Sequence, residues 1–280
     1  MVPNMAQATT GPDPSMTEQQ QPTALRALIF DVDGTLADTE RHGHRPAYNR
    51  AFDDLGADWS WSESEYGELL EIEGGQERLQ HYLDFYQPDF EPADGQDEFI
   101  DAAHARKNLH YRNLLQTGAV PLRPGIRRLI AEARADGLRL AIASSSQRAN
   151  VMALLAHVLE GPAEDLFEVI VTGTEAAAKK PSADIYRRVL ERLDLAAEAC
   201  IAIEDSANGC RSALAAGVAT IVTTSSYTSH HDFAGAAVVA DSLGDPHRPW
   251  RVLHGIHPGT EYLDIRALRH IHAHALAGGA

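Results

Sequence analysis

The chain has 280 residues, 44% of them hydrophobic, and a formal net charge of -16 at pH 7. This length and composition are typical of a soluble globular protein with one large domain or two modest ones. Nucleic acids and anionic membranes bind proteins through a basic surface, so the acidic charge argues against both as partners. The two cysteines, Cys200 and Cys210, exclude a disulfide framework and favour a reducing, cytoplasmic setting.

The N-terminal segment, residues 1–24, carries no basic side chain. A secretory signal needs a positive start and an apolar stretch, and a transit peptide needs arginines, so neither fits this segment. We interpret it as a disordered tail rich in Gln, Pro, Thr and Ser. No apolar run elsewhere approaches the ~20 residues that a bilayer-spanning helix needs.

From residue 25 onward, short apolar runs alternate with segments of helical spacing. This alternation predicts an α/β fold with a doubly wound parallel sheet flanked by helices. The predicted strands are Arg26–Phe30, Leu138–Ala143, Val169–Val171, Cys200–Ile203, Thr220–Val222 and Val238–Ala240. The predicted helices between them are Gly125–Asp136, Ala149–Leu159, Ala183–Leu193 and Asn208–Ala216.

A long segment, residues 42–120, separates the first two predicted strands and shows no clear strand of its own. We interpret it as a separate helical cap domain over the carboxyl edge of the sheet, where open parallel sheets bind ligands. The core domain would then consist of residues 25–41 and 121–244. Helical spacing within the cap is found in Glu65–Leu70, Gln76–Tyr86 and Asp97–Gln116.

The alternation of strands and helices stops after Gly244, so residues 245–280 are expected to form a C-terminal extension. His270 and His274 are one helical turn apart there, with His272 between them. No cysteine accompanies these histidines, and no acidic residue follows at a matching spacing. A surface helix or a frayed terminus is therefore favoured over a metal site.

Polar residues follow three of the predicted strands directly, and Lys180 precedes a proline at the start of a predicted helix. Because the ends of parallel strands meet at one edge of a sheet, these side chains are expected to share a crevice. The residues at the strand ends are Asp31 and Asp33, the run Ser144-Ser145-Ser146, and Glu204 with Asp205.

Carboxylates gathered this closely repel one another unless a cation lies among them. Mg²⁺ suits that position, since it prefers oxygen ligands and binds through one or two carboxylates plus a substrate phosphate. In such a site Asp31 would attack phosphorus in line while Ser144 and Lys180 hold the other phosphate oxygens. Asp33 would protonate the leaving oxygen, and water would then release the phosphate from the aspartyl phosphate.

Four short motifs together resemble those of the haloacid dehalogenase-like hydrolases, in their order and approximate spacing. They are DVDGT, the hydroxyl that follows a strand, the lysine before a proline, and the acidic pair in EDS. The resemblance covers about Leu25 to Gly244 and implies a Rossmann-like core with an inserted helical cap. It also implies Mg²⁺ as the cofactor.

The resemblance implies a role for each residue that matches a motif. Asp31 would be the nucleophile and Asp33 the general acid and base, while Ser144 and Lys180 would bind phosphate. The implied metal ligands are Asp31, the backbone carbonyl of Asp33, Glu204 and Asp205.

A closer resemblance is to the CbbY-type sugar bisphosphate phosphatases, which are similar to the beta-phosphoglucomutases. It rests on the stretches DWSWSESEYGELL, EGGQERL, HARK and SSYTSHHDFAGA. It implies xylulose-1,5-bisphosphate or a similar ketose bisphosphate as substrate, with His104 and Lys107 on its distal phosphate. The implied substrate-binding residues are Glu40, Tyr66, Gly74, Gly75, Gln76, Arg78, His104, Lys107, Ser145 and Asn150.

Gln76 departs from this pattern, since CbbY-type enzymes usually carry lysine there and the mutases arginine. The loss of a cation weakens the expectation of a second phosphate unless Arg78, Arg106 or Lys107 compensates. Lys179 is expected to be solvated, and Ser144 is compatible with a second role as a helix cap.

Alternative functions remain open. The same motifs fit a sugar phosphomutase, or a phosphatase of a sugar monophosphate or of phosphoglycolate. A haloacid dehalogenase would have little use for a second acid or a metal site, and an inactive binding protein would not need every key residue. A small phosphorylated sugar is the expected partner, and a monomer is the expected state.

Overall fold

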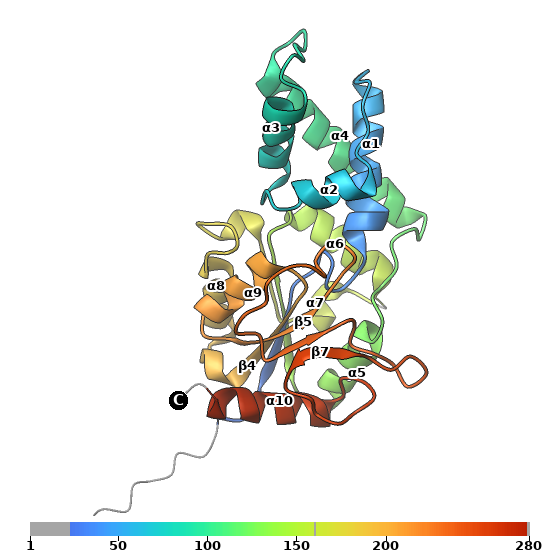
Figure 1. The fold of residues 1–280 in the computed structure, drawn as a ribbon. Helices are drawn as coiled ribbons and strands as arrows, with labels where there is room; N and C mark the ends of the chain where they lie inside the picture. The colour runs from blue at the N-terminus through green and yellow to red at the C-terminus, as the bar shows by residue number, and fades with distance from the viewer. Residues whose placement is uncertain (1–22, 160, 279–280) are drawn as a thin grey trace, which may run out of the picture.

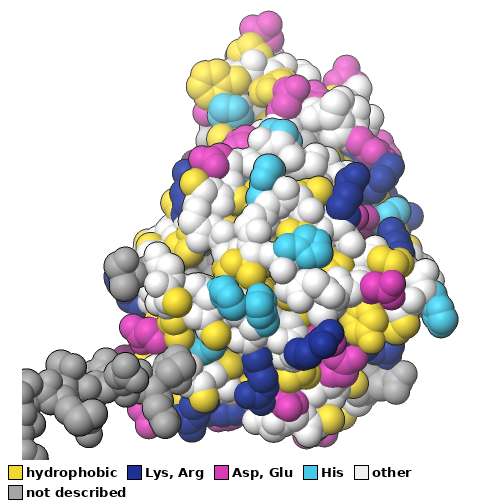
Figure 2. Space-filling view, turned by 60° about the horizontal axis from the view of Figure 1, so that its bottom comes forward, with side chains coloured by type: hydrophobic (Ala, Val, Ile, Leu, Met, Phe, Trp, Pro, Cys, Tyr) yellow, Lys and Arg dark blue, Asp and Glu magenta, His cyan; other side chains and the backbone are white. Residues whose placement is uncertain are grey.

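The computed structural model describes residues 23–159 and 161–278. The predicted disordered tail, residues 1–24, lies outside this range except for its last two residues. Within the described residues no helix is both long enough and apolar enough to span a bilayer. Acidic, basic and histidine side chains are interspersed on the face of the molecule shown in Figure 2.

The larger lobe is built on a seven-stranded sheet, and the strand order is β3-β2-β1-β4-β5-β6-β7. Every neighbouring pair is parallel except β6 and β7, which are antiparallel. This arrangement confirms the predicted fold class. The strands are β1 (Ala27–Phe30), β2 (Arg139–Ser144), β3 (Val169–Thr172), β4 (Cys200–Glu204), β5 (Ala219–Thr223), β6 (Val238–Ala240) and β7 (Val252–Gly255).

Helices cover both faces of this sheet (Figure 1). In β1, Leu28 and Phe30 belong to the apolar cluster on one face, whereas Ala27 and Ile29 belong to the cluster on the other. A strand that is buried on both faces appears in the sequence as a continuous apolar run. The helices of this lobe are α5 (Ile126–Ala135), α6 (Arg148–Val158), α7 (Ala163–Leu166), α8 (Asp184–Leu193), α9 (Ala207–Ala215) and α10 (Ile265–Ala277).

The prediction that strands and helices stop alternating after Gly244 is wrong. Strand β7 pairs with β6, and α10 begins at Ile265, preceded by Asp264, whose side chain accepts a hydrogen bond from the Ala267 N–H group. α10 lies at the end of the sheet opposite the helices α1–α4 (Figure 1). It buries Leu268 and Ile271, whereas His270 and His274 are exposed, so it is the predicted surface helix and not a frayed terminus.

The smaller lobe contains four helices, α1 (Arg45–Asp54), α2 (Glu63–Leu69), α3 (Gly75–Tyr86) and α4 (Gln96–Gln116). It stands on the sheet lobe at the end away from α10 (Figure 1). Its aromatic cluster, which includes Tyr48, Phe52 and Trp61, is separate from the clusters beside the sheet. This separation supports the cap limits proposed from the sequence, residues 42–120, which remain a proposal.

Two chain segments connect the lobes and run side by side. Ala37 forms a bridge with Leu122, and the Asp38 N–H group donates to the Pro121 carbonyl at 3.1 Å. The first segment then enters the π-helix Glu40–His44, which leads directly into α1. This paired crossing is the covalent connection between the two lobes.

Candidate active site

A cavity of about 360 Å³ lies where the cap faces the carboxyl edge of the sheet. Residues from both lobes line it. All of the predicted site residues contribute to its wall except Tyr66 and Glu204, which are fully buried. The sequence therefore identified residues that the fold brings to one place.

Three buried acids lie together at the sheet end of this cavity. Asp31 follows β1 and Asp205 follows β4, the neighbouring strand, whose last residue is Glu204. A ligand oxygen from each of the three acids lies within 4.8 Å of the others. Burial, helped by Glu204 and Asp33, raises the pKa of Asp31 to about 7.

Lys180 holds this acid cluster together. Its ammonium donates to Asp31 Oδ1 at 2.7 Å, to Glu204 Oε1 at 2.6 Å and to the Ala143 carbonyl at 3.0 Å. Although burial alone would lower the pKa of Lys180, Asp31 and Glu204 raise it above its usual value. Lys180 is therefore a fixed cation beside the carboxylate that the sequence identifies as the nucleophile.

The donor set fits a divalent cation. Three buried carboxylates face one ammonium, and burial together with Asp31 and Glu204 raises the pKa of Asp205 well above its usual value. Carboxylates in this situation are stabilised by a bound cation, and their oxygens are the ligands that Mg²⁺ and Ca²⁺ prefer. Asp31 and Asp205 line the cavity and are the accessible ligands.

Glu204 is the least accessible of the predicted metal ligands. Its Oε1 accepts hydrogen bonds from Lys180 and from the Tyr186 hydroxyl, the latter at 2.6 Å. Its Oε2 accepts from the Asp205 N–H group at 3.3 Å. The direct effect of Glu204 in this structure is to position Lys180.

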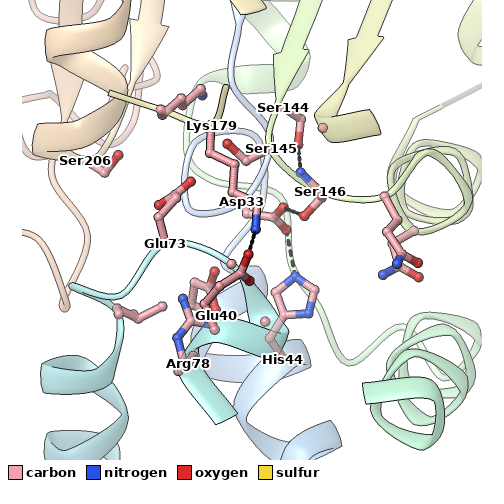
Figure 3. Close-up of a pocket in the computed structure, with 18 of the residues that line it drawn as sticks. Asp33, Glu40, His44, Glu73, Arg78, Ser144, Ser145, Ser146, Lys179 and Ser206 are labelled. Atoms are coloured by element: carbon pink, nitrogen blue, oxygen red, sulfur yellow. Dashed lines mark hydrogen bonds and ion pairs between the residues drawn. The ribbon is translucent and has the colours of Figure 1, made fainter. Parts of the chain in front are cut away.

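Asp33 turns its carboxylate toward His44 and Ser146 (Figure 3). Its Oδ1 lies 2.9 Å from His44 Nε2, and its Oδ2 accepts a hydrogen bond from the Ser146 hydroxyl. Burial alone would raise the pKa of Asp33, but His44 and these hydrogen bonds hold that pKa below its usual value. Asp33 is thus fixed as a separate carboxylate near Asp31, the predicted nucleophile.

Sequence reasoning missed His44. The imidazole stacks on Tyr111 of the cap with a centroid separation of 4.1 Å, while its Nε2 faces Asp33 of the core. It belongs to the π-helix Glu40–His44, whose wider turn a 3.6-residue period does not describe. The histidine itself was visible in the sequence, but no helical spacing pointed it at Asp33.

The serine run at the cavity contains hydroxyls with unused donors. Ser144 Oγ accepts a hydrogen bond from the Ser146 N–H group at 3.2 Å (Figure 3). Ser145 Oγ is buried and has no hydrogen-bond partner among the described residues. The reading of Ser144 as a helix cap is wrong, because α6 begins after Gln147 and has no side-chain cap.

Two of the predicted substrate-binding residues make hydrogen bonds to other residues of the cap. Arg78 is buried and donates to the carbonyls of Leu69 and Ile72 at 2.9 and 3.1 Å. It therefore braces the turn between α2 and α3. Gln76 Nε2 donates to Asp101 Oδ1 at 2.6 Å. Both residues line the cavity, but these donors are already paired with protein acceptors.

Lys107 differs from these cap residues, because no hydrogen bond or ion pair joins it to any of the described residues. It is 7% exposed, lines the cavity, and lies with its ammonium 5.0 Å from the Tyr48 ring centroid. Burial lowers the pKa of Lys107 to about 8. Burial also lowers the pKa of nearby His104, to about 4, so this imidazole is neutral at pH 7. Arg106, named above as a possible substitute cation, does not line the cavity.

The remaining predicted contacts shape the cavity wall. Glu40 Oε2 accepts from the Tyr66 hydroxyl at 2.5 Å. Asn150 donates to Asn108 Oδ1 at 2.9 Å and accepts from Arg112 at 3.2 Å, so its amide is occupied by the protein.

The glycine pair at the start of α3 is required by close approach. A Cβ atom on Gly75 would lie 2.7 Å from the Tyr48 hydroxyl and 2.9 Å from His104 Nε2. Gly74 has a φ of 101°, a backbone conformation that favours glycine. These residues are therefore more than an unconstrained turn, because they let the backbone lie against the cavity wall.

One ion pair and one contact between a histidine and a carboxylate join the lobes at the cavity rim. Lys179, expected to be solvated, is about half exposed and pairs with Glu77 of α3. His231 Nε2 lies 3.0 Å from Glu71 Oε1, while its Nδ1 accepts from the Ala207 N–H group. Sequence reasoning could not find either contact, because both depend on the placement of the cap.

Comparison with known proteins agrees with the motifs. A family model described as haloacid dehalogenase-like hydrolase matches residues 25–217. The chain is 46% identical over 248 residues to Protein CbbY of Cupriavidus necator, covering 89% of this chain and 97% of that protein. It is also 46% identical over 212 residues to Protein CbbY of Rhodobacter capsulatus, covering 76% and 91%.

A solved structure of a CbbY protein is also similar to this chain in sequence and fold. It is a variant of CbbY from Rhodobacter sphaeroides in complex with xylulose-1,5-bisphosphate, with 44% sequence identity and a TM-score of 0.72. The match covers 78% of this chain and 94% of that chain. The chain therefore belongs to the haloacid dehalogenase-like hydrolases, in their CbbY-like branch, and it is a phosphatase.

Proposed function

We propose that this enzyme is a Mg²⁺-dependent phosphatase of a sugar bisphosphate, either xylulose-1,5-bisphosphate or a similar ketose bisphosphate. The observation that carries the proposal is a cavity lined by a buried cation from each lobe, Lys180 beside Asp31 and the unpaired Lys107 in the cap. The CbbY relative in complex with xylulose-1,5-bisphosphate supports the same class of substrate.

The unpaired ammonium of Lys107 argues for an anion at the cap end. A buried charge without a hydrogen-bonding partner is costly, and a phosphate group would supply the missing acceptors. Lys107 thereby takes the place of the cation that Gln76 lacks. The cavity volume of about 360 Å³ lies in the range of small-molecule sites.

At the sheet end, Lys180 orients Asp31 for attack on phosphorus. Because its ammonium has three protein acceptors, it keeps the attacking carboxylate in place. The unpaired hydroxyl of Ser145 can donate to a phosphoryl oxygen, beside Ser144 on the same turn. Attack would give an aspartyl phosphate on Asp31, from which water releases phosphate.

Asp33 is the proposed proton carrier. His44 and Ser146 hold its two carboxylate oxygens in a fixed direction, which general acid and base catalysis requires. We propose His44 and Ser146 as positioning residues for this carboxylate.

Asp31 and Asp205, with the Asp33 backbone carbonyl, are the proposed ligands of Mg²⁺, and Glu204 would act from behind them through Lys180. When bound, Mg²⁺ would neutralise the charge of the acids and of the phosphoryl oxygens. The raised pKa values of Asp31 and Asp205 support this assignment, because both shifts reflect buried carboxylates without enough counter-charge.

The test is phosphate release with Mg²⁺ from xylulose-1,5-bisphosphate, ribulose-1,5-bisphosphate, fructose-1,6-bisphosphate, beta-glucose-1-phosphate and phosphoglycolate, with Asp31→Asn as control. We expect the ketose bisphosphates to be the best substrates and the variant to be inactive. Glucose-6-phosphate in place of free phosphate would identify a mutase. Preference for a monophosphate would contradict the bisphosphate proposal, and equal release by the variant would contradict the role of Asp31.

A further inference from the structure

Arg123 lies between the paired crossing that connects the two lobes and the cluster of Asp31, Glu204 and Asp205. It is the first residue on the core side of the Ala37–Leu122 bridge, and its own N–H group donates to the Leu36 carbonyl at 2.9 Å. Its guanidinium makes no ion pair with any described carboxylate at hydrogen-bond distance. The guanidinium instead donates to backbone carbonyls.

These carbonyls come from three separate loops. One terminal nitrogen of Arg123 donates to the Gly34 carbonyl at 2.6 Å and to the Thr223 carbonyl at 2.7 Å. The other donates to the carbonyls of Thr224 at 2.6 Å and Asp241 at 3.0 Å. The planar fork of arginine donors can satisfy several fixed acceptors at once, which a lysine ammonium does with less geometric definition.

The sheet order places these bonds around the acid cluster. Gly34 follows β1, Thr223 ends β5, and Asp241 follows β6, while β4 lies between β1 and β5. Asp205 follows β4. The bonds of Arg123 therefore join the loop after β1 to strand ends on the far side of β4, so they enclose the strand end that carries Asp205.

Gly34 transmits this constraint to the cluster. A Cβ atom on Gly34 would overlap the Asp205 carboxylate, so the glycine backbone lies directly against that side chain. Gly34 has a φ of 84°, and its N–H group, in the same peptide plane as the Asp33 carbonyl, donates to the Ala37 carbonyl at 3.0 Å. Because glycine is the most flexible residue, a fixed carbonyl removes freedom that the loop would otherwise have.

We propose that Arg123 is a positioning residue for the acid cluster. By holding the Gly34 carbonyl it fixes the loop between Asp31 and Ala37 against Asp205, and it thereby sets the affinity of the cluster for a divalent cation. This inference rests on the proposed cation site of Asp31 and Asp205. Arg123 would then have two roles. It lies next to the crossing that connects the cap to the core, and it holds the loop that faces the proposed metal site.

The charge of Arg123 agrees with this task. Burial lowers the pKa of Arg123, but Asp205, Asp38 and Asp241 raise it, and an arginine stays protonated in proteins. A permanent cation behind Asp205 limits the repulsion among the acids without occupying the cavity, because Arg123 does not line it. Residues that hold metal ligands from behind typically change metal affinity by about 10- to 100-fold when they are replaced.

Arg128 provides a matched control. It is also an arginine that donates to backbone carbonyls, those of Leu263 at 3.1 Å and Gly244 at 2.8 Å. No hydrogen bond connects it to the loop after β1, among the bonds found for the described residues. Arg128→Met removes a carbonyl-binding arginine from the same lobe, so it reports the general cost of such a loss.

The experiment measures the dissociation constant of Mn²⁺, a paramagnetic substitute for Mg²⁺, by electron paramagnetic resonance in the absence of substrate. The proteins are the natural chain, Asp205→Asn, Arg123→Met, Arg123→Lys and Arg128→Met. We expect a dissociation constant raised about tenfold or more in Arg123→Met. A smaller increase is expected in Arg123→Lys, and no more than about a twofold change in Arg128→Met, which serves as the reference for general loss of stability.

Unchanged Mn²⁺ affinity in Arg123→Met, with weakened affinity in Asp205→Asn, would overturn the inference and leave the proposed cation site intact. If Asp205→Asn binds Mn²⁺ as tightly as the natural chain, the proposed cation site is wrong and the inference falls with it. Should Arg123→Met fail to fold, Arg123→Lys decides by the same comparison. An equal loss of affinity in Arg128→Met would also overturn the inference, because it would show that any carbonyl-binding arginine has this effect.

Discussion

At the residue scale, the chemistry depends on side chains whose charges are incompletely compensated by the protein. Asp31 has a raised pKa because burial and the charges of Glu204 and Asp33 oppose its ionisation. Asp205 has a raised pKa because burial and the charges of Asp31 and Glu204 oppose its ionisation. Lys107 is a buried cation without a paired anion among the described residues, and its ammonium lies over the rings of Tyr48 and Tyr111. Native proteins pair nearly all buried polar groups, so unpaired ones at a cavity wall indicate where a ligand would bind.

Replacing Lys107 tests the cap end of the cavity. We expect Lys107→Met to raise KM for a ketose bisphosphate by about tenfold or more, since a hydrogen bond to a charged group contributes about 1.5 to 3 kcal/mol. KM for a monophosphate should stay nearly unchanged. Arg106→Met, on the same helix but away from the cavity, is the control. An equal rise in KM for both substrate classes would place the distal phosphate elsewhere.

The same lysine predicts a pH dependence. Burial lowers the pKa of Lys107 to about 8, with Glu40 and Asp33 acting to raise it and Arg78 to lower it. The cation is thus present below about pH 8 and is lost as the pH rises through that value, so kcat/KM for a bisphosphate should fall on the alkaline side. Lys107→Arg keeps its charge at these pH values. A pH profile with the same alkaline limb in both proteins would show that another group titrates.

Residue types and motif spacing identified the acids, Lys180 and the serine run, because four strand ends meet at one edge. They did not reveal which atoms remain free. Within the part of the chain that the structure describes, Ser145 makes no hydrogen bond through its hydroxyl and Ser144 only accepts one, whereas Arg78 and Asn150 use their side chains on protein partners. His44 was missed because a π-helix directs it at Asp33. Such details depend on packing that no sequence spacing encodes.

At the element scale, buried strands were predictable and the edge strand was not. The predicted ends of β1 to β6 lie within one residue of those observed, because each is a short apolar run. β7 is only partly buried and reads Val-Leu-His-Gly, so neither a continuous run nor an alternation marks it. An edge strand is defined by its pairing with β6, which is a tertiary property.

The packing of α10 gives a prediction about stability. Leu268 is fully buried on this helix, whereas Arg266 is exposed. We expect Leu268→Ala to lower the free energy of unfolding by about 2 to 5 kcal/mol, and Arg266→Ala to change it by about 0.5 kcal/mol or less. Urea unfolding measures both. Equal stability of the two variants would mean that α10 is not part of the folded core.

At the scale of the whole molecule, two lobes cooperate around one cavity. The acids, the serines and Lys180 come from the sheet lobe, whereas Lys107 comes from the cap. His44 and Tyr111 connect them, since the imidazole stacks on a cap residue while it faces Asp33. Closure of the cap would exclude bulk water from the reaction, and its opening would release the products.

The ion pair between Lys179 and Glu77 at the rim predicts how the cap is held. Lys179 and Glu77 are about half exposed, so their pair should contribute about 1 kcal/mol or less to unfolding stability. We expect Lys179→Met to leave urea unfolding nearly unchanged and to increase amide hydrogen exchange in residues 70–75. Arg188→Met, which removes a partner of Glu191 on α8, is the control. Exchange as slow as in the natural chain would show that this pair does not hold the cap.

The motifs predicted the presence of an inserted cap, but its position on the sheet could not be derived from them. Contacts such as Lys179 with Glu77 join residues that are far apart in sequence and exposed in both lobes. No apolar pattern marks an exposed ion pair. The residues at the strand ends therefore indicate only part of the function, and the cap side of the site depends on how the cap is placed.

The central claim is that Asp31 becomes covalently phosphorylated during turnover. The most direct measurement is mass spectrometry of peptides from enzyme that has been mixed with xylulose-1,5-bisphosphate and Mg²⁺ and quenched in acid within the first turnovers. We predict one phosphoryl group on the peptide that contains Asp31, and none in Asp31→Asn. Rapid release of phosphate without any phosphorylated peptide, or a phosphoryl group on another residue, would contradict the account.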